Sequence, residues 1–231
     1  MKMLHQLKWQ LIILHKNSII SISLVVTIIY GIFLFFLNDL EAIDKILITL
    51  VLNDPSVIGY FFIALAVYME IKYEILPAIF ISPISLHYYI ISKILALSII
   101  GLGCSLGLVF FVKGLAFGIL NYSIGAFGIC LLSSLLGLMV LNYADDFLKF
   151  SLISVPLFIL FINVPLLQYL GVIEIGFIKY LFPIQGCVDL IENAISGVPI
   201  HLPFAYLSVL FWIPIFYMSA FKLFNKRTVQ R

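Results

Sequence analysis

The chain has 231 residues and a formal net charge of +2, and 64% of its residues are apolar while only 10% are charged. With a mean hydropathy of +1.21, it cannot form the charged surface of an ordinary soluble domain. The small net charge, without a basic cluster interleaved with aromatics, also argues against a nucleic-acid partner. The composition therefore predicts a membrane protein whose side chains contact lipid.

The first element in chain order is an amphipathic stretch, residues 1–17. Its leading apolar residues share one arc of a helix: Met3, Leu4, Leu7, Leu11 and Leu14. This pattern predicts an N-terminal interfacial helix. The uncharged run that follows is too long for the core of a signal peptide and lacks a small-x-small cleavage pattern, so we expect it to be retained as the first span.

Six stretches are long enough to cross about 30 Å of hydrocarbon as helices. They are residues 18–37, 55–70, 86–112, 118–141, 150–170 and 203–222. The second follows Asn53 and Asp54, which are good capping residues, and it opens with Pro55, which suits a first helical turn. No internal repeat is visible, so we expect one all-α transmembrane domain over residues 1–231.

The distribution of lysine and arginine orients these spans. With six spans both termini lie on one side, and that side carries ten of the 13 basic residues. The other side has Lys45, Lys113 and Lys179. Both termini are therefore expected in the cytoplasm. Lysine far exceeds arginine and isoleucine is abundant, which points to an AT-rich bacterial genome and so to a bacterial inner membrane.

The stretch "EILPAIFISPISLHYYIISK", residues 74–93, is nearly as long as a span but is not expected to cross. If it did, every later loop would change sides and the bias of the basic residues would vanish. Only Lys93 would then join it to the next span, and two antiparallel helices need a longer turn. We instead expect a short cytoplasmic helix over residues 72–82, ended by Pro83, with Ser85 capping the third span.

A second amphipathic segment, residues 171–202, precedes the last span. Beyond Pro183 its apolar residues follow helical spacing: Ile184, Cys187, Val188, Ile191, Ala194 and Ile195. Polar residues, including Asp189 and Glu192, fall on the opposite side, and Gly197 suits the helix end. We expect a pair of short helices, broken at Pro183, that lies on or dips into the outer leaflet.

The sequence contains few motifs that are typical of catalytic, phosphate-binding or metal-binding sites. No GxxxxGK[ST] phosphate loop is present, so the chain is not expected to hydrolyse ATP itself. The 4 histidines and 3 cysteines lack metal-binding spacing, and no metal or other cofactor of its own is expected. A literal GxSxG, residues 103–107, lies inside the third span rather than on a strand-turn-helix elbow. We interpret it as a helix-packing site, where a residue larger than Gly103 would disturb the packing.

Charged residues are not found near the middle of the predicted spans, where ion- or proton-coupled transporters usually keep them. This pattern predicts an energy source outside the membrane. Asn163, between Pro156 and Pro165, is the most polar deep position, and the two prolines predict a kinked helix. Asn163 is either part of a substrate path or a residue that satisfies the backbone at the kink.

The stretch "EIKYEILPAIFISPISLHYYIISK", residues 70–93, resembles the segment between the second and third spans of ATP-binding-cassette type-2 (ABC-2) permeases. In that family an acidic residue ends span two, a short helix lies against a cytoplasmic ATPase, and Pro-x-Ser with aromatics and a lysine opens span three. The layout of an N-terminal amphipathic helix, six spans and a broken pair before the last span is also similar. Within the family, the chain looks most like permeases of the fluoroquinolone-export type.

The resemblance implies that residues 72–82 form a coupling helix in a groove of a separately encoded ATPase, which binds ATP and Mg²⁺. Nine residues would carry the coupling: Glu70, Lys72, Glu74, Ile75, Leu76, Ile79, Phe80, Pro83 and Ser85. Polar contacts at the membrane face would come from Glu70, Lys72 and Glu74. The groove would be filled by Ile75, Leu76, Ile79 and Phe80, and the turn into span three would be fixed by Pro83 and Ser85. Pro77 departs from the family, because proline inside the helix would shorten it. A homodimer is also implied.

The expected function is the permease subunit of an ATP-driven exporter of an amphipathic or hydrophobic compound, such as a drug, a peptide or a lipid-like molecule. The chain itself is expected not to be an enzyme. Two alternatives stay open: an intramembrane hydrolase that uses Ser105, and an ATPase-independent channel or assembly protein. Asp145 and Asp146, on the same face as the coupling segment, are either a second ATPase contact or solvated loop acids.

Overall fold

The protein was analysed as a computed structural model, which describes residues 2–37, 42–73, 75 and 85–229. All regular elements in those ranges are helical. The α-helices are α1 (Lys2–Lys16), α2 (Ile19–Phe36), α3 (Ile43–Lys72), α5 (Leu86–Lys113), α6 (Ile119–Leu141), α7 (Phe147–Phe158), α8 (Val164–Tyr169), α9 (Gln185–Ser196) and α10 (Leu202–Val229). Between them lie a π-helical turn, η1 (Ile159–Asn163), and a 3₁₀-helix, η2 (Gly176–Leu181).

Six helical segments are long and apolar enough to cross a membrane. They are α2, α3, α5, α6, the continuous run of α7, η1 and α8, and α10. The all-helical class and the six spans predicted from the sequence are therefore confirmed. The chain is a multi-pass membrane protein.

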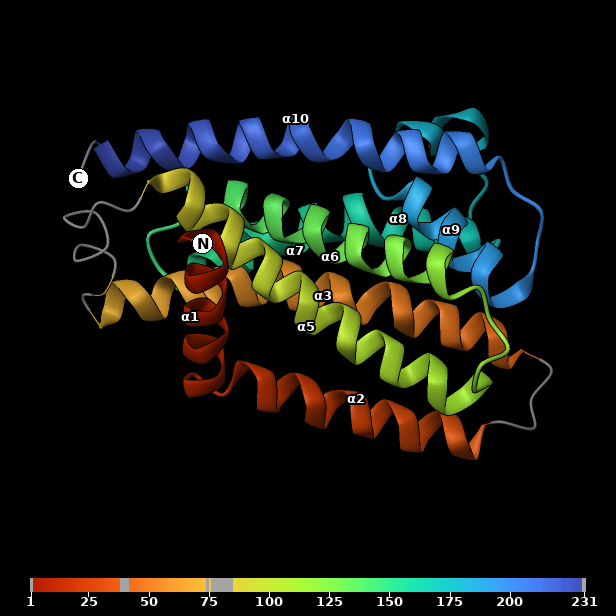
Figure 1. Ribbon diagram of the computed structural model, residues 1–231. Coiled ribbons are helices and arrows are strands. Elements are labelled where there is room, and N and C mark those ends of the chain that lie inside the picture. The colour runs from red at the N-terminus through yellow and green to blue at the C-terminus, as the bar shows by residue number, and fades with distance from the viewer. Residues whose placement is uncertain (1, 38–41, 74, 76–84, 230–231) are drawn as a thin grey trace.

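The spans run along a common direction, and both ends of the chain lie at the same end of the bundle (Figure 1). We call it the terminal end. It holds the last turn of α3, the first turn of α5, the loop between α6 and α7, and the end of α10. The opposite, far end holds the start of α3, the loop between α5 and α6, and η2. Helix α1 lies across the spans (Figure 1) and packs on α5 and α2.

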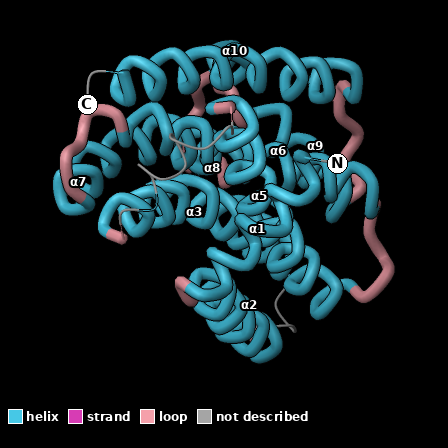
Figure 2. The backbone as a smooth tube through the Cα atoms, turned by 60° about the vertical axis from the view of Figure 1, so that its left-hand side comes forward, coloured by secondary structure: helices cyan, strands magenta, loops and turns pink. Residues whose placement is uncertain are grey.

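Helix α6 forms the core of the bundle, packing against α3, α5, α9 and α10. Two glycines let α3 and α6 approach closely, because each leaves room for a backbone oxygen. A Cβ on Gly59 would overlap the carbonyl oxygen of Cys130, and a Cβ on Gly137 would overlap that of Tyr60. By contrast, α2 stands at the edge of the bundle (Figure 2), and most of its large apolar side chains are exposed.

Gly103 does not pack against a neighbouring helix, so the packing role predicted for it is wrong. It lies on the exposed side of α5, and a Cβ there would have no atom within 4 Å. Gly101 faces the core instead, where a Cβ would lie 2.8 Å from the sulfur of Cys130. Two residues along a helix rotate the side chain by about 200°. The prediction therefore named a suitable residue type on the wrong face.

Helix α3 begins at Ile43, and not at the predicted start near Pro55. The helix continues through Pro55, which is buried inside it. Polar side chains bond the backbone around this point: Asn53 donates to the carbonyl of Thr49, and Ser56 to that of Leu52. Neither bond reaches the carbonyl of Val51, which Pro55 leaves without its usual helical donor. The helix continues because α3 is packed between neighbouring helices. The Asn-Asp-Pro sequence therefore marks the interior of α3 and not its start.

The fifth span is interrupted between its two prolines. Pro156 lies inside α7 and Pro165 in the first turn of α8, and the residues between α7 and α8 form the π-helical turn η1. A π-turn inserts one extra residue into a helix and is frequent at functional sites. The interruption predicted from the prolines thus takes the form of a wider turn, with Asn163 as its last residue.

At the far end, α9 follows η2 after a break at Pro183. The apolar face predicted for this helix is buried: Ile184, Cys187, Val188, Ile191, Ala194 and Ile195. It packs on α6 and α10, so the face that was expected to meet the outer leaflet contacts protein. Gly197 ends the helix with a positive φ of 68°, which glycine adopts without strain.

Candidate functional site

A buried ion pair joins α3 to α5 near the terminal end. Lys93 Nζ lies 2.6 Å from Glu70 Oε1, and both side chains have 0% exposure. The Tyr89 hydroxyl donates to the other carboxylate oxygen of Glu70, at 2.5 Å. Lys93 Nζ also lies 4.9 Å from the centre of the Tyr89 ring. One carboxylate therefore binds two side chains of α5, and we call Glu70, Tyr89 and Lys93 the junction cluster.

Aromatic contacts extend this cluster to α10. The ring of Tyr89 stacks on Phe224, with ring centres 6.1 Å apart. One turn away, the His87 ring stacks on Phe221 at 3.9 Å, and His87 Nδ1 lies 2.7 Å from the Tyr217 hydroxyl. Helices α3, α5 and α10 are thus fastened together where the chain leaves α3 and enters α5.

Four of the nine residues expected to carry the coupling lie in the described part of the chain. Glu70 is fully buried, so its contacts in this structure are internal. Lys72 is exposed at the end of α3, and Ile75 is half-buried. Ser85 caps α5 as predicted, because its hydroxyl accepts a hydrogen bond from the Tyr88 N–H at 3.5 Å. The other five lie outside the described residues: Glu74, Leu76, Ile79, Phe80 and Pro83.

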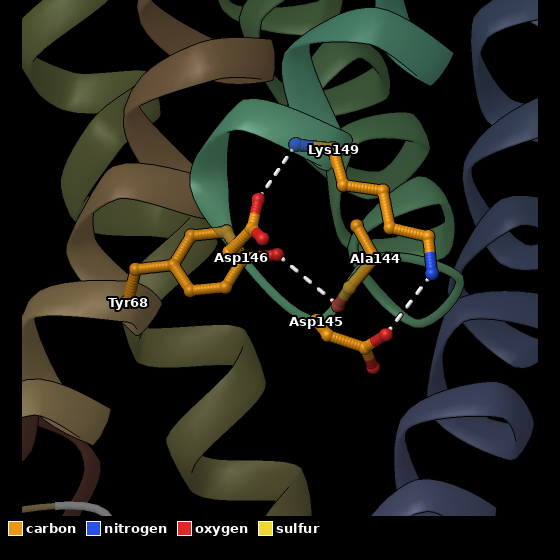
Figure 3. Close-up of polar contacts among 5 residues, drawn as sticks. All are labelled: Tyr68, Ala144, Asp145, Asp146 and Lys149. Carbon is orange, nitrogen blue, oxygen red and sulfur yellow. Dashed lines mark hydrogen bonds and ion pairs between the residues drawn. The ribbon is translucent and has the colours of Figure 1, made fainter.

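The loop between α6 and α7 is fixed at the same end (Figure 3). Asp146 caps α7 by accepting a hydrogen bond from the Lys149 N–H at 2.7 Å. Asp145 pairs with Lys149 Nζ at 3.0 Å, and the Tyr68 hydroxyl of α3 donates to the carbonyl of Ala144 at 3.2 Å. Both aspartates therefore have structural partners within the loop, and the loop is attached to α3 close to the junction cluster.

The junction cluster joins the end of α3 to the start of α5. A buried ion pair contributes little net stability, because removing two charges from water offsets their attraction. Its geometry is nevertheless strongly preferred, because separating the partners would leave unpaired charges in an apolar interior. A displacement of the segment between Tyr73 and Ser85 would therefore move the ends of α3 and α5 together.

Sequence reasoning missed the partners of Glu70. From the sequence, Lys93 counts among the charges that set the topology and is the lysine that opens span three in the resemblance, and Tyr89 is one of its aromatics; neither is predicted to contact Glu70. The available signal was that Glu70 and Lys93 sit within long apolar stretches at the end of one span and the start of the next. Ionisable groups in such places usually pair with one another.

The two other positions singled out from the sequence lie away from this cluster. Asn163 ends η1 and is half-buried. Ser105 is buried inside α5, where its hydroxyl donates to the carbonyl of Leu102 at 3.0 Å. Its own carbonyl accepts a hydrogen bond from the Tyr122 hydroxyl at 2.6 Å. These contacts belong to helix packing, and the nucleophile elbow of a hydrolase is not formed here.

A hollow of about 560 Å³ opens at the far end, between η2, α9 and the start of α10. It is lined by Phe177, Lys179, Tyr180, Asp189, Glu192, Val198, Pro199, Ile200, His201 and Phe204. Burial raises the pKa of the Asp189 carboxyl above its usual value, while a hydrogen bond from Gln185 and the charge of Lys179 act in the opposite direction. Burial and the charge of Asp189 likewise raise the pKa of Glu192. The hollow combines aromatic walls with two acids that hold protons more tightly than usual.

Replacing Asp189 by asparagine is expected to make the protein more stable than the wild type at neutral pH and above, but not at acidic pH. Because the folded-state pKa is raised, the stability of wild type is highest below the unfolded pKa of about 3.9 and falls as pH rises through the folded pKa. Asparagine does not titrate and keeps the acceptor for Gln185. Asp189 is partly exposed, so the gain should stay below about 1 kcal/mol. Thermal unfolding in detergent from pH 4 to 8 would measure it, and a pH-independent difference would contradict it.

Comparison with known proteins adds no family assignment: no protein-family model matches the chain, and no curated protein matches it.

Proposed function

We propose that this chain is the membrane-spanning permease subunit of an ATP-driven exporter of the ABC-2 type, working as a homodimer with a separately encoded ATPase. The exported compound would be amphipathic or hydrophobic. Both termini would lie in the cytoplasm of a bacterium, with the terminal end of the bundle facing the ATPase and the far-end hollow opening outside.

The observation that carries this proposal is the junction cluster. A permease without an ATP site must receive movement from its partner and pass it to its spans. The segment between Tyr73 and Ser85 connects α3 to α5, and Glu70 of α3 is paired with Lys93 of α5. A force applied to this segment would therefore reach two spans, and through the stacking of Tyr89 on Phe224 it would also reach α10.

Two other features support the orientation. The basic residues Lys16, Lys149, Lys222 and Lys226 lie on elements of the terminal end, as expected of a cytoplasmic face. Helix α1 crosses the direction of the spans (Figure 1), which suits a helix that lies at the membrane surface. Its partly exposed apolar residues include Leu4 and Trp9, which would face the lipid headgroups.

A crosslinking experiment tests the proposal. The tagged chain carrying Ile79→Cys would be treated in native membranes with a thiol crosslinker and purified in mild detergent. We expect a covalent product with a nucleotide-binding subunit, identified by mass spectrometry. The background should be low because Cys104, Cys130 and Cys187 are all buried.

The matched control is Phe177→Cys, because Phe177 is 86% exposed and lies at the far end. It should give no product with the ATPase. If no ATPase copurified, and the cysteine at position 79 reacted freely with water-soluble reagents, the permease proposal would be wrong. An ATPase-independent channel or an assembly protein would then be the favoured function.

A further inference from the structure

Asp54 places a carboxyl group well inside a span. It lies 11 residues after the first residue of α3 and 18 before the last, or about 16 Å and 27 Å along the helix axis. The side chain is 5% exposed, and its Oδ2 atom has no hydrogen-bond partner. The expectation that the spans carry no charged residue near their middle therefore does not hold for α3, since it depended on a helix start at Pro55.

No lysine on the described helices that pack against α3 is available to Asp54. Lys93 and Lys113 of α5 pair with Glu70 and Asp44, each at 2.6 Å, and Lys149 of α7 pairs with Asp145 at 3.0 Å. Helices α2, α6 and α9 contain no lysine or arginine. The acids of α9, Asp189 and Glu192, line the far-end hollow. A carboxylate buried without a cationic partner carries a large desolvation cost.

The groups around Asp54 do not form a site for a metal cation. The turn of α3 that follows Asp54 packs against α5 and α6. A Cβ on Gly101 of α5 would lie 3.6 Å from the Cα atom of Pro55 and 2.8 Å from the sulfur of Cys130 on α6. Hard cations such as Ca²⁺ and Mg²⁺ need several oxygen ligands, and no group of three or more His, Cys, Asp or Glu side chains among the described residues could hold a metal ion. A proton needs only one oxygen.

Pro55 adds an acceptor for such a proton. Proline has no N–H, so the carbonyl of Val51 lacks the donor that a regular helix would supply. Val51 precedes Asp54 by three residues, which places the two on the same face of α3. A neutral carboxylic acid could donate its O–H to this carbonyl, while a carboxylate would be repelled by it.

We propose that Asp54 is a proton-binding site inside the bundle, and that its bound proton holds α3 packed against α5 and α6. Loss of the proton leaves a carboxylate that must be hydrated, which favours separation of these helices. The conformation of the bundle is therefore linked to pH at a point far from the junction cluster. This inference does not depend on an ATPase.

Infrared spectroscopy of the reconstituted full chain tests the bound proton directly. At pH 6 the wild type should show a carboxylic-acid C=O band that shifts on transfer to D₂O and that disappears in Asp54→Asn. The band should weaken reversibly as pH is raised. If wild type and Asp54→Asn had the same carboxylic-acid absorbance at pH 6, the proposal would be overturned.

The native cysteines test the link to packing. Cys104 and Cys130 are buried on α5 and α6, the two helices that pack most extensively on α3, so a small thiol reagent should reach them only when these helices separate. Labelling of the wild type should rise with pH more steeply than that of Asp54→Asn, by up to about tenfold per pH unit. Dividing the labelling rate of the wild type by that of Asp54→Asn removes the pH dependence of the thiols themselves. Cys187, which is buried on α9, is the internal control and should give a constant ratio. If the wild type and Asp54→Asn gave parallel pH profiles of labelling at Cys104 and Cys130, protonation of Asp54 would not be what holds the helices together.

Discussion

Replacing Lys93 by alanine is expected to lower the free energy of unfolding by about 3–5 kcal/mol, because it leaves the fully buried carboxylate of Glu70 without a counter-charge. The double variant Glu70→Leu with Lys93→Met should recover most of that loss, since replacing both charges by apolar side chains is often neutral or stabilising. Unfolding by SDS in mixed micelles would compare both variants with the wild type.

The exposed pair of Lys149 and Asp145 is the matched control. Its side chains are 52% and 74% exposed, so Lys149→Ala should cost below about 1 kcal/mol. Equal costs for Lys93→Ala and Lys149→Ala would contradict the burial of the junction cluster. Failure of the double variant to recover stability would instead show that Tyr89 depends on the carboxylate of Glu70 as an acceptor.

Replacing Gly59 by alanine is expected to cost about 3 kcal/mol, at the upper end of overpacking effects. The added Cβ meets the backbone oxygen of Cys130, which cannot move aside as a flexible side chain could. Helix α3 would have to shift away from α6, which forms the core of the bundle. Thermal unfolding in detergent, together with the yield of monodisperse protein, would show the effect.

The control for this variant is Gly103→Ala. Its Cβ enters open space, so the substitution should be neutral or should stabilise the helix by up to about 1 kcal/mol. Equal destabilisation by the two substitutions would mean that the α3–α6 contact is not the close approach described here. Together the two substitutions test whether close helix packing depends on Gly103, as the sequence predicts, or on Gly59, as the structure shows.

Much of the fold could be predicted from the sequence, because apolar length and the turn residues that bound it are local properties. The predicted third span begins at residue 86, and α5 begins at Leu86 behind its Ser85 cap. The start of α3 could not be found in this way. A capping signal such as Asn-Asp-Pro assumes that the backbone before it is free to leave the helix, and tertiary packing prevents that here.

The junction cluster could not be predicted from the sequence, because its residues are brought together by the packing of α5 on α3. Glu70 was singled out because of its position near a turn, but its partners were set by how α5 lies against α3. The packing glycines could not be identified from spacing either. Gly103 and Gly137 both stand in small-residue patterns, but only Gly137 faces a neighbouring helix. Asp54 was placed near a predicted helix end, which hid its depth.

The composition of α3 also bears on how the chain enters the membrane during synthesis. Helix α2 has no charged residue and can partition into lipid as soon as it leaves the ribosome. Helix α3 carries Asp44, Asp54 and Glu70, and an aspartate at a span centre opposes insertion by about 2.5–3.5 kcal/mol. The lysines that neutralise Asp44 and Glu70 belong to α5, and the helices that pack most extensively on α3 are α5 and α6. We therefore expect α3 to insert more readily together with α5 and α6, which are translated after it, than by itself.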